Sequence, residues 1–271
     1  TAQAYMNLKN KRIGRRAVIL GSGDIGMIMA RRLTLEGVKV EAVFEIQPYA
    51  SGLPRNIEQC LKDYGIPLYL SHTVTDIKGA GRLEAVEVSR VDQRLQPVPG
   101  TEKIYPCDTL ILSVGLIPEN ELSRMAGIEM DPRTKGAVVD EFYQTSVPGI
   151  FAAGNVLHVH DLVDFVSLEA ERLADSAADY LRGKRIPARI PVSAGGEIGY
   201  TVPQHITGTR DVTLSFRPRH PLRDSWVEIR QGERCLLRKK YPRLLPAVME
   251  NIALPVSRLI SDSEIKVVTV N

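Results

Sequence analysis

Residues 18–33, VILGSGDIGMIMARRL, decide the fold class of the N-terminal half of the chain. A short β-rich run, residues 16–20, ends directly at a glycine loop. Apolar side chains then recur at helical spacing as far as Gly37. Residues 38–45, VKVEAVFE, predict a second buried strand. A strand, a glycine loop, a helix and a strand within about thirty residues form a βαβ unit, which requires parallel strands.

The glycine loop has the spacing of a dinucleotide site. Its first glycine allows a tight turn, its second lets a pyrophosphate approach the backbone, and its third lets the helix pack close to the sheet. The helix N-terminus supplies N–H groups and partial positive charge for phosphates. The cofactor-binding residues predicted here are Gly21, Ser22, Gly23, Asp24, Ile25 and Gly26.

Glu45 lies about twenty residues after the loop, at the end of the second predicted strand. A carboxylate there accepts hydrogen bonds from the adenosine ribose and repels a 2′-phosphate. No arginine follows it directly, so the sequence favours NAD over NADP. The alternative is an ordinary turn with an incidental glutamate.

The rest of the chain continues the α/β pattern and then changes. We expect a helix over 54–64 and a strand over 66–70. Three short segments, within 72–108, predict an antiparallel meander inserted before a buried strand at 109–115. Residues 136–155 predict two more short strands, and 164–182 predict a helix with an apolar face. After a proline-containing stretch, short alternating segments predict a small β-sandwich.

Two later motifs carry a resemblance to a known family. LILSVGLIPEN, residues 110–120, and TSVPGIFAAGN, residues 145–155, resemble the signatures of the two-dinucleotide-domain flavoproteins, the group of glutathione reductase, thioredoxin reductase and NADH oxidase. The resemblance implies that Gly115 and Pro118 lie where the NAD and FAD domains meet. It implies that nicotinamide lies over Gly115 and Leu116, next to the flavin.

The same resemblance assigns flavin contacts to the second motif. It implies that Gly154 and Asn155 contact the ribityl chain of FAD. It also implies that Val163 and Asp164 face the flavin ring and pyrophosphate from the start of the next helix. Asn155 stands where the family has aspartate, so it can accept a hydrogen bond but brings no charge.

The resemblance implies an FAD-dependent NADH oxidoreductase that passes hydride between nicotinamide and flavin. That step needs proximity and exclusion of water rather than a protein acid or base, so we assign no catalytic residue. The expected cofactors are NAD and, in the full-length protein, FAD. A non-catalytic NAD-binding or subunit-docking module is the alternative.

The expected organisation follows from what the chain lacks. The family begins with an FAD-binding half, but only twenty residues precede Gly21, so we expect a fragment without that half. We expect its exposed helix face to be covered by a partner subunit or a second copy. The predicted fold is a Rossmann-like NAD-binding domain with an inserted β-meander, followed by a small all-β sandwich. The expected segments are an FAD-domain tail at 1–15, the NAD domain at 16–140, the last strand and helix of the FAD domain at 141–183, a linker at 184–196 and the sandwich at 197–271.

The segment LHVHDLVD places His158, His160, Asp161 and Asp164 close together. Two histidines with nearby carboxylates are compatible with a metal site. The competing interpretations are a polar loop beside the flavin and ordinary surface. We assign no metal ligand here.

Composition excludes several classes. The formal net charge is +3, with 25% charged residues that do not cluster, so nothing indicates a nucleic-acid partner. No apolar run approaches the roughly eighteen residues of a membrane span. The three cysteines lie far apart, which argues against disulfides and suits a reducing cytoplasm. Cys60, Cys107 and Trp226 are expected to be packed in cores, and residues 238–240, RKK, to form a solvated edge.

Overall fold

The computed structural model describes residues 1–184, 187–188 and 190–270. The chain divides into two compact units, Thr1–Gly115 and Leu116–Asn271. Among the described residues, none of the helices combines the length and the apolar character needed to cross a membrane.

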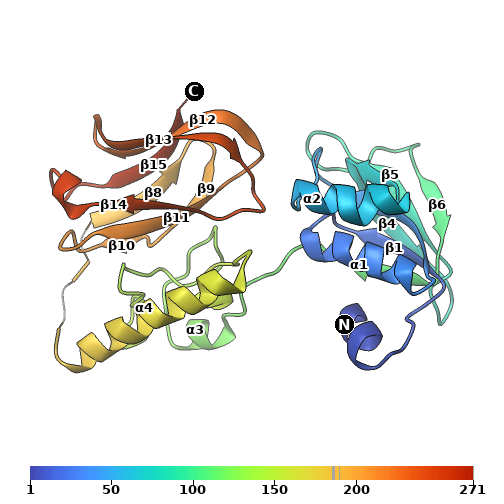
Figure 1. Cartoon of the computed structure of the whole chain (residues 1–271), viewed down its shortest axis with the longest axis horizontal. Coiled ribbons are helices and arrows are strands. Elements are labelled where there is room, and N and C mark those ends of the chain that lie inside the picture. Colours follow the sequence, from blue (N-terminus) through green and yellow to red (C-terminus); the bar gives the residue numbers. More distant parts are fainter. Residues whose placement is uncertain (185–186, 189, 271) are drawn as a thin grey trace. The chain divides into compact units, whose positions relative to one another are not determined.

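Unit 1 is built on a parallel four-stranded sheet (Figure 1). Its strand order is β3-β2-β1-β7, and β1 pairs in parallel with both β2 and β7. Ala17, Val18 and Ile19 of β1 are fully buried because this central strand is covered on both faces. The predicted βαβ unit is confirmed. The strands are β1 (Arg16–Leu20), β2 (Lys39–Glu45), β3 (Leu68–Leu70) and β7 (Thr109–Leu112).

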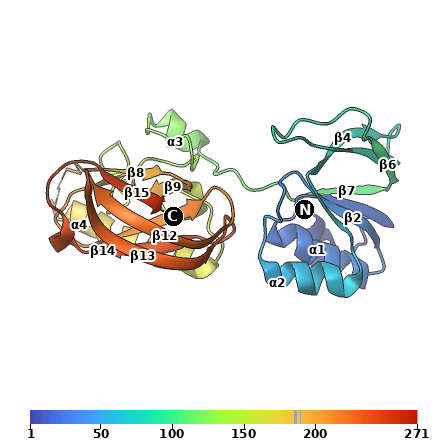
Figure 2. The same cartoon turned by 90° about the horizontal axis from the view of Figure 1, so that it is seen from above.

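Helices cover one face of this sheet and the meander covers the other (Figure 2). Met27 and Leu33 of α1 pack with Cys60 in the core on the helical face. Phe44 packs with Cys107 in the core on the meander face. The helical elements are η1 (Ala4–Leu8), α1 (Asp24–Leu35) and α2 (Pro54–Asn56), the last continuing as η2 (Ile57–Leu61) and η3 (Lys62–Tyr64). The predicted antiparallel meander is confirmed as β4 (His72–Lys78), β5 (Ala85–Arg90) and β6 (Lys103–Pro106).

Unit 2 contains the β-sandwich. One sheet has the order β10-β8-β15-β12-β13 and the other β14-β11-β9. Apolar side chains from both sheets, such as Leu214, Phe216 and Ile229, meet in one core. The strands are β8 (Ile190–Gly195), β9 (Ile198–Val202), β10 (His205–Ile206), β11 (Val212–Pro218), β12 (Leu222–Gln231), β13 (Arg234–Leu244), β14 (Glu250–Leu254) and β15 (Ile265–Val270), with η5 (Val256–Arg258) before β15.

The sandwich begins earlier than expected. Its strand β8 falls within the predicted linker, of which residues 185, 186 and 189 lie outside the described residues. Ile190 and Val192 are buried while Pro191 between them is exposed, which is strand alternation rather than linker sequence. β8 pairs with β10 and in parallel with β15, so it is an internal strand of its sheet.

Residues 116–183 pack beside the sandwich within unit 2 (Figure 1). Ile128, Ala137, Val139 and Leu157 form one buried cluster with Val202 of β9. The compact boundary therefore lies at Gly115 rather than at residue 140. Residues 136–155 make isolated bridges instead of the two expected strands. The helical elements here are α3 (Glu121–Met125), η4 (Gly154–Val156) and α4 (Val163–Leu181).

Trp226 corrects another expectation. It is half-buried on β12, and the Arg238 guanidinium lies 4.3 Å from its ring centroid. Its neighbour Val227 points into the core, so strand alternation places Trp226 on the outer face. Residues 238–240 are exposed on β13 at the edge of its sheet, as predicted.

Candidate functional site

The glycine loop joins the carboxyl end of β1 to α1. Gly21 has φ +99°, and a Cβ there would lie 2.1 Å from the Ser113 carbonyl oxygen. A Cβ on Gly26 would lie 2.7 Å from the Gly21 oxygen and 2.8 Å from Ser113 Cβ. These two glycines are therefore required by the protein's own packing.

Gly23 differs from the other two glycines. It is the N-cap of α1 with φ −63° and ψ 162°, a conformation open to any residue. A Cβ on Gly23 would lie 3.6 Å from Ser113 Oγ, an ordinary contact. No side chain caps α1, so the first N–H groups of this helix are available to an anion.

Glu45 lies at the end of β2 but points inward. Its side chain is buried, and Oε2 accepts hydrogen bonds from Ser22 N at 3.0 Å and from Ser22 Oγ at 2.6 Å. Ser51 Oγ donates to the same oxygen, and Gln47 N donates to Oε1 at 2.9 Å. The carboxylate thus ties the glycine loop to the segment that follows β2.

That segment, residues 47–56, closes onto the loop through Ser22 and Asp24. Gly52 N donates to the Ser22 oxygen at 3.0 Å. Leu53 N at 2.7 Å and Asn56 Nδ2 at 2.6 Å both donate to Asp24 Oδ1. Asp24 therefore holds the loop in place with a side chain that is already occupied. The sequence motif identified Asp24 and Glu45 but gave no signal for Ser51 or Asn56.

Ile25 of the glycine loop and the predicted nicotinamide-side residues, Gly115 and Leu116, are exposed. Ile25 is 62% exposed and lines a cavity of about 710 Å³ between residues 1–13 and β7. None of the loop glycines lines this cavity. Gly115 has φ +101° with open space around its Cβ position, and it ends unit 1. Leu116 begins unit 2 and is 71% exposed.

Of the predicted flavin-side residues, two stabilise their own loop and two are exposed on the surface. Gly154 is buried with φ +71°, and its N–H donates to Glu169 Oε2. Asn155 Oδ1 accepts a hydrogen bond from His160 N at 3.0 Å, so this amide closes its own loop. Val163 and Asp164 are exposed in the first turn of α4, which has no side-chain cap.

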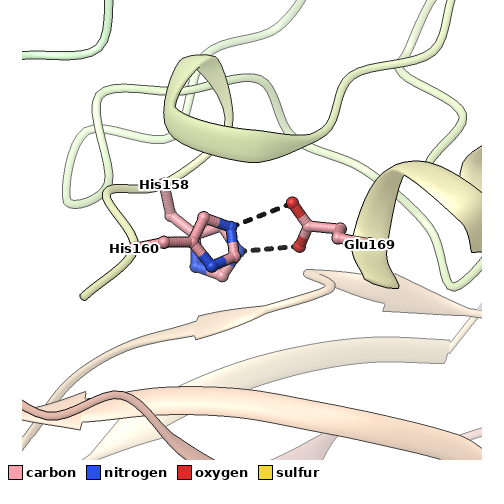
Figure 3. A group of neighbouring side chains, drawn as sticks. All are labelled: His158, His160 and Glu169. Carbon is pink, nitrogen blue, oxygen red and sulfur yellow. Dashed lines mark hydrogen bonds and ion pairs between the residues drawn. The ribbon is translucent and has the colours of Figure 1, made fainter. Parts of the chain in front are cut away.

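His158 and His160 converge on one carboxylate, that of Glu169 (Figure 3). His158 Nε2 lies 2.9 Å from Glu169 Oε1, and His160 Nε2 lies 3.1 Å from Oε2. The side chains of the two histidines are only 1% and 2% exposed. Both Nδ1 atoms are buried without a hydrogen-bond partner among the described residues.

Sequence spacing suggested Asp161 and Asp164 as the nearby carboxylates, and that suggestion was wrong. Asp164 is exposed on α4, whereas Glu169 is on the buried face of that helix with Ser176, two turns further on. Burial raises the pKa of Glu169, but hydrogen bonds from His158 and His160 outweigh this and lower the pKa to about 2.

Side chains of the β-sandwich contact the loop that carries His158 and His160. Arg217 of β11 donates to the Val159 oxygen at 3.0 Å and to Asp161 Oδ1 at 3.2 Å. Its Nε donates to Tyr200 Oη at 3.1 Å, and the Tyr200 ring lies 6.1 Å from the His158 ring. Neither Tyr200 nor Arg217 follows any motif, because both come from the region that sequence patterns describe only as sandwich.

Comparison with known proteins agrees with the α/β architecture. The family model described as pyridine nucleotide-disulphide oxidoreductase matches residues 1–188. The chain belongs to this family. Its members are FAD- and NAD(P)-dependent oxidoreductases, which confirms the family and the cofactor classes expected from the sequence.

Three relatives show how far the similarity extends. The chain is 27% identical over 187 residues to glutamate synthase [NADPH] small chain of Escherichia coli, covering 62% of this chain and 39% of the relative. It is 30% identical over 179 residues to NADH oxidase of Methanocaldococcus jannaschii, covering 63% of this chain and 35% of the relative. The structure of thioredoxin reductase from T. acidophilum matches with TM-score 0.52 and 27% identity, covering 61% of this chain and 53% of that structure's chain. The chain thus spans less than half the length of these two curated relatives.

Proposed function

We propose that this chain is the NAD-binding part of an FAD-dependent NADH oxidoreductase, passing hydride between nicotinamide and flavin. The observation that supports this best is Gly23, where the protein's own packing leaves room for a side chain. A glycine is needed there if a pyrophosphate approaches the backbone at that point. The uncapped N-terminus of α1 lies directly after it and suits the same anion.

NAD is the proposed dinucleotide because of Glu45. A carboxylate at the end of β2, without a following arginine, repels a 2′-phosphate even when it is buried. The Glu45 carboxylate already accepts bonds from Ser22, Gln47 and Ser51, so contact with a ribose requires Oε1 or a shift of residues 47–53.

This chain's residues would bind and orient the cofactors. When bound, the two dinucleotides supply the hydride donor and acceptor, and the protein supplies proximity and exclusion of water. Gly115 and Leu116 are proposed beneath the nicotinamide. Gly154, Asn155, Val163 and Asp164 are proposed on the flavin side. Three free cysteines support a cytoplasmic location.

Titration of the purified chain with NADH and NADPH tests the proposal. We expect NADH to bind more tightly, and Glu45→Gln to narrow the difference because it removes the charge while keeping the side chain's size. Equal or tighter binding of NADPH by the unchanged chain would contradict the assignment. Ile77→Ala, an exposed change on β4, is the control that should leave both affinities unchanged.

The alternative is a non-catalytic module that holds NAD and docks other subunits through its β-sandwich. NADH oxidation by the full-length protein, followed by flavin absorbance, separates the two. Turnover supports the oxidoreductase, whereas NADH binding without turnover supports the module.

A further inference from the structure

His158, His160 and Glu169 form a buried group whose polar atoms point at one another. One ligand atom from each residue can be chosen so that all lie within 4.8 Å of one another. The two Nε2–Oε separations, 2.9 and 3.1 Å, are close to the roughly 3.3 Å between ligand atoms around a tetrahedral ion with bonds of about 2.0–2.1 Å. The two distances involve different oxygens of Glu169, so the three side chains would adjust when an ion binds.

The charge of this group points the same way. Glu169 is a buried carboxylate, and its ion-pair partners among the described residues are the two histidines alone. Two neutral imidazoles leave its negative charge uncompensated, which is unfavourable in a buried setting. A divalent cation would compensate the charge and would bind each imidazole through Nε2, in place of the proton that Nε2 donates to Glu169.

Neighbouring residues restrain the three proposed ligand side chains in the absence of an ion. Gly154 N donates to Glu169 Oε2, and Asn155 fixes the backbone of His160. Arg217 anchors Val159 between the two histidines from the sandwich. The three side chains therefore come from a loop and a helix that are both restrained.

We propose that His158, His160 and Glu169 bind a divalent transition-metal ion, best matched by Zn²⁺. Two imidazoles and one carboxylate suit zinc rather than Ca²⁺ or Mg²⁺, which prefer oxygen ligands. Three protein ligands leave one coordination position for a further ligand. The ion would join the loop at 154–161 to α4, and the inference does not depend on nucleotide binding.

Metal content of the full 271-residue chain tests this inference. The chain is stripped with a chelator, dialysed and titrated with Zn²⁺ alone, with Co²⁺ as a spectroscopic probe. We expect one equivalent of metal, a melting temperature that rises with free Zn²⁺, and visible Co²⁺ bands of a low-coordinate nitrogen–oxygen site. His160→Ala and Glu169→Gln should weaken binding by at least about tenfold, since loss of an outer-shell partner alone costs about 10- to 100-fold.

His220→Ala is the matched control, because the His220 side chain is about half-exposed and its ion-pair partner is Glu197. It should bind Zn²⁺ as the unchanged chain does. If a ligand variant fails to fold, the unchanged chain still decides the matter through its metal content and melting temperature. Absence of a Zn²⁺-dependent shift, or binding that the ligand variants leave intact, would overturn the site and leave a hydrogen-bonded cluster without metal.

Discussion

At the scale of single residues, the three glycines of the dinucleotide motif are glycine for different physical reasons. Gly21 and Gly26 are required because a Cβ would meet backbone or Ser113 atoms well inside contact distance. Gly23 has room for a methyl group and a backbone conformation that alanine adopts freely. The sequence motif gives all three glycines the same weight. Only at Gly23 can a substitution test ligand binding without disturbing the protein's own packing.

Gly23→Ala should therefore leave the fold intact and reduce NADH affinity at least about tenfold, because the added methyl group occupies the space expected for the pyrophosphate. Gly26→Ala, in contrast, should lower the free energy of unfolding by about 1–3 kcal/mol through overpacking. Urea unfolding and NADH titration of both variants provide the check. Unchanged NADH affinity in a folded Gly23→Ala chain would place the dinucleotide elsewhere.

Asp140 offers a prediction about pH. Burial raises its pKa to about 6, although its carboxylate accepts hydrogen bonds from Phe142 N and Gln144 N. A folded pKa above the unfolded value means that this residue's stabilising contribution is complete below about pH 4 and is lost as the pH rises through about 6.

Asp140→Asn should thus stabilise the protein at pH 7 by about 1–3 kcal/mol and have little effect near pH 4, since asparagine keeps an acceptor oxygen without the charge. The measurement is urea unfolding of both proteins at the two pH values. A difference between variant and unchanged chain that is the same at both pH values would rule out this titration.

At the scale of elements, β8 shows how an internal strand can look like a linker. Its sequence begins with Ile190 and Pro191 after a basic, proline-containing stretch. Pro191 is tolerated because it sits at the beginning of the strand, opposite His205 of the two-residue strand β10. The partner on the other side, β15, lies at the far end of the chain, so no local pattern reveals the pairing.

A fragment that begins at Glu197 should therefore fail to fold independently, because it lacks an internal strand and the buried Ile190 and Val192. The fragment 116–271, which contains the whole second unit, should melt cooperatively. Circular dichroism melts of the two fragments provide the comparison. A cooperative melt of the fragment 197–271 would show that β8 is dispensable.

Helix α4 is amphipathic, but its apolar residues are not all on the face that packs. Val166, Leu173 and Ala177 are half-buried, while Ala170, Ala174 and Leu181 are exposed. The apolar face predicted for this helix is therefore only partly exposed. Glu169 and Ser176 occupy the most buried side, and the polar cluster at Glu169 explains why a charged residue is there.

At the scale of the whole molecule, flavin retention is the decisive question. The described residues contain one glycine loop of the dinucleotide type, and the proposed flavin side consists of Gly154, Asn155 and the start of α4. We expect these few contacts to be too weak to offset the entropy lost on ordering so large a cofactor. We expect the purified 271-residue chain to be colourless and to transfer no hydride. Its absorption spectrum is the measurement, and stoichiometric flavin bands would contradict the expectation.

What the sequence determined by itself is the local part of the structure. The βαβ unit, the meander, the long helix and the packed cysteines follow from periodicity, glycine positions and apolar runs, which act over a few neighbouring residues. The dinucleotide motif was recognisable for the same reason, since its glycines are set by local backbone requirements. The family followed from motifs of this local kind.

Only the tertiary structure decided which distant residues meet. Ser51 and Asn56 close on the glycine loop, Glu169 replaces Asp161 and Asp164 beside the histidines, and Arg217 reaches the histidine loop from the sandwich. These contacts join residues from separate elements, and long-range burial selects them from many chemically equivalent side chains. Sequence spacing constrains neighbours along the chain, whereas the choice among distant partners depends on how the elements pack.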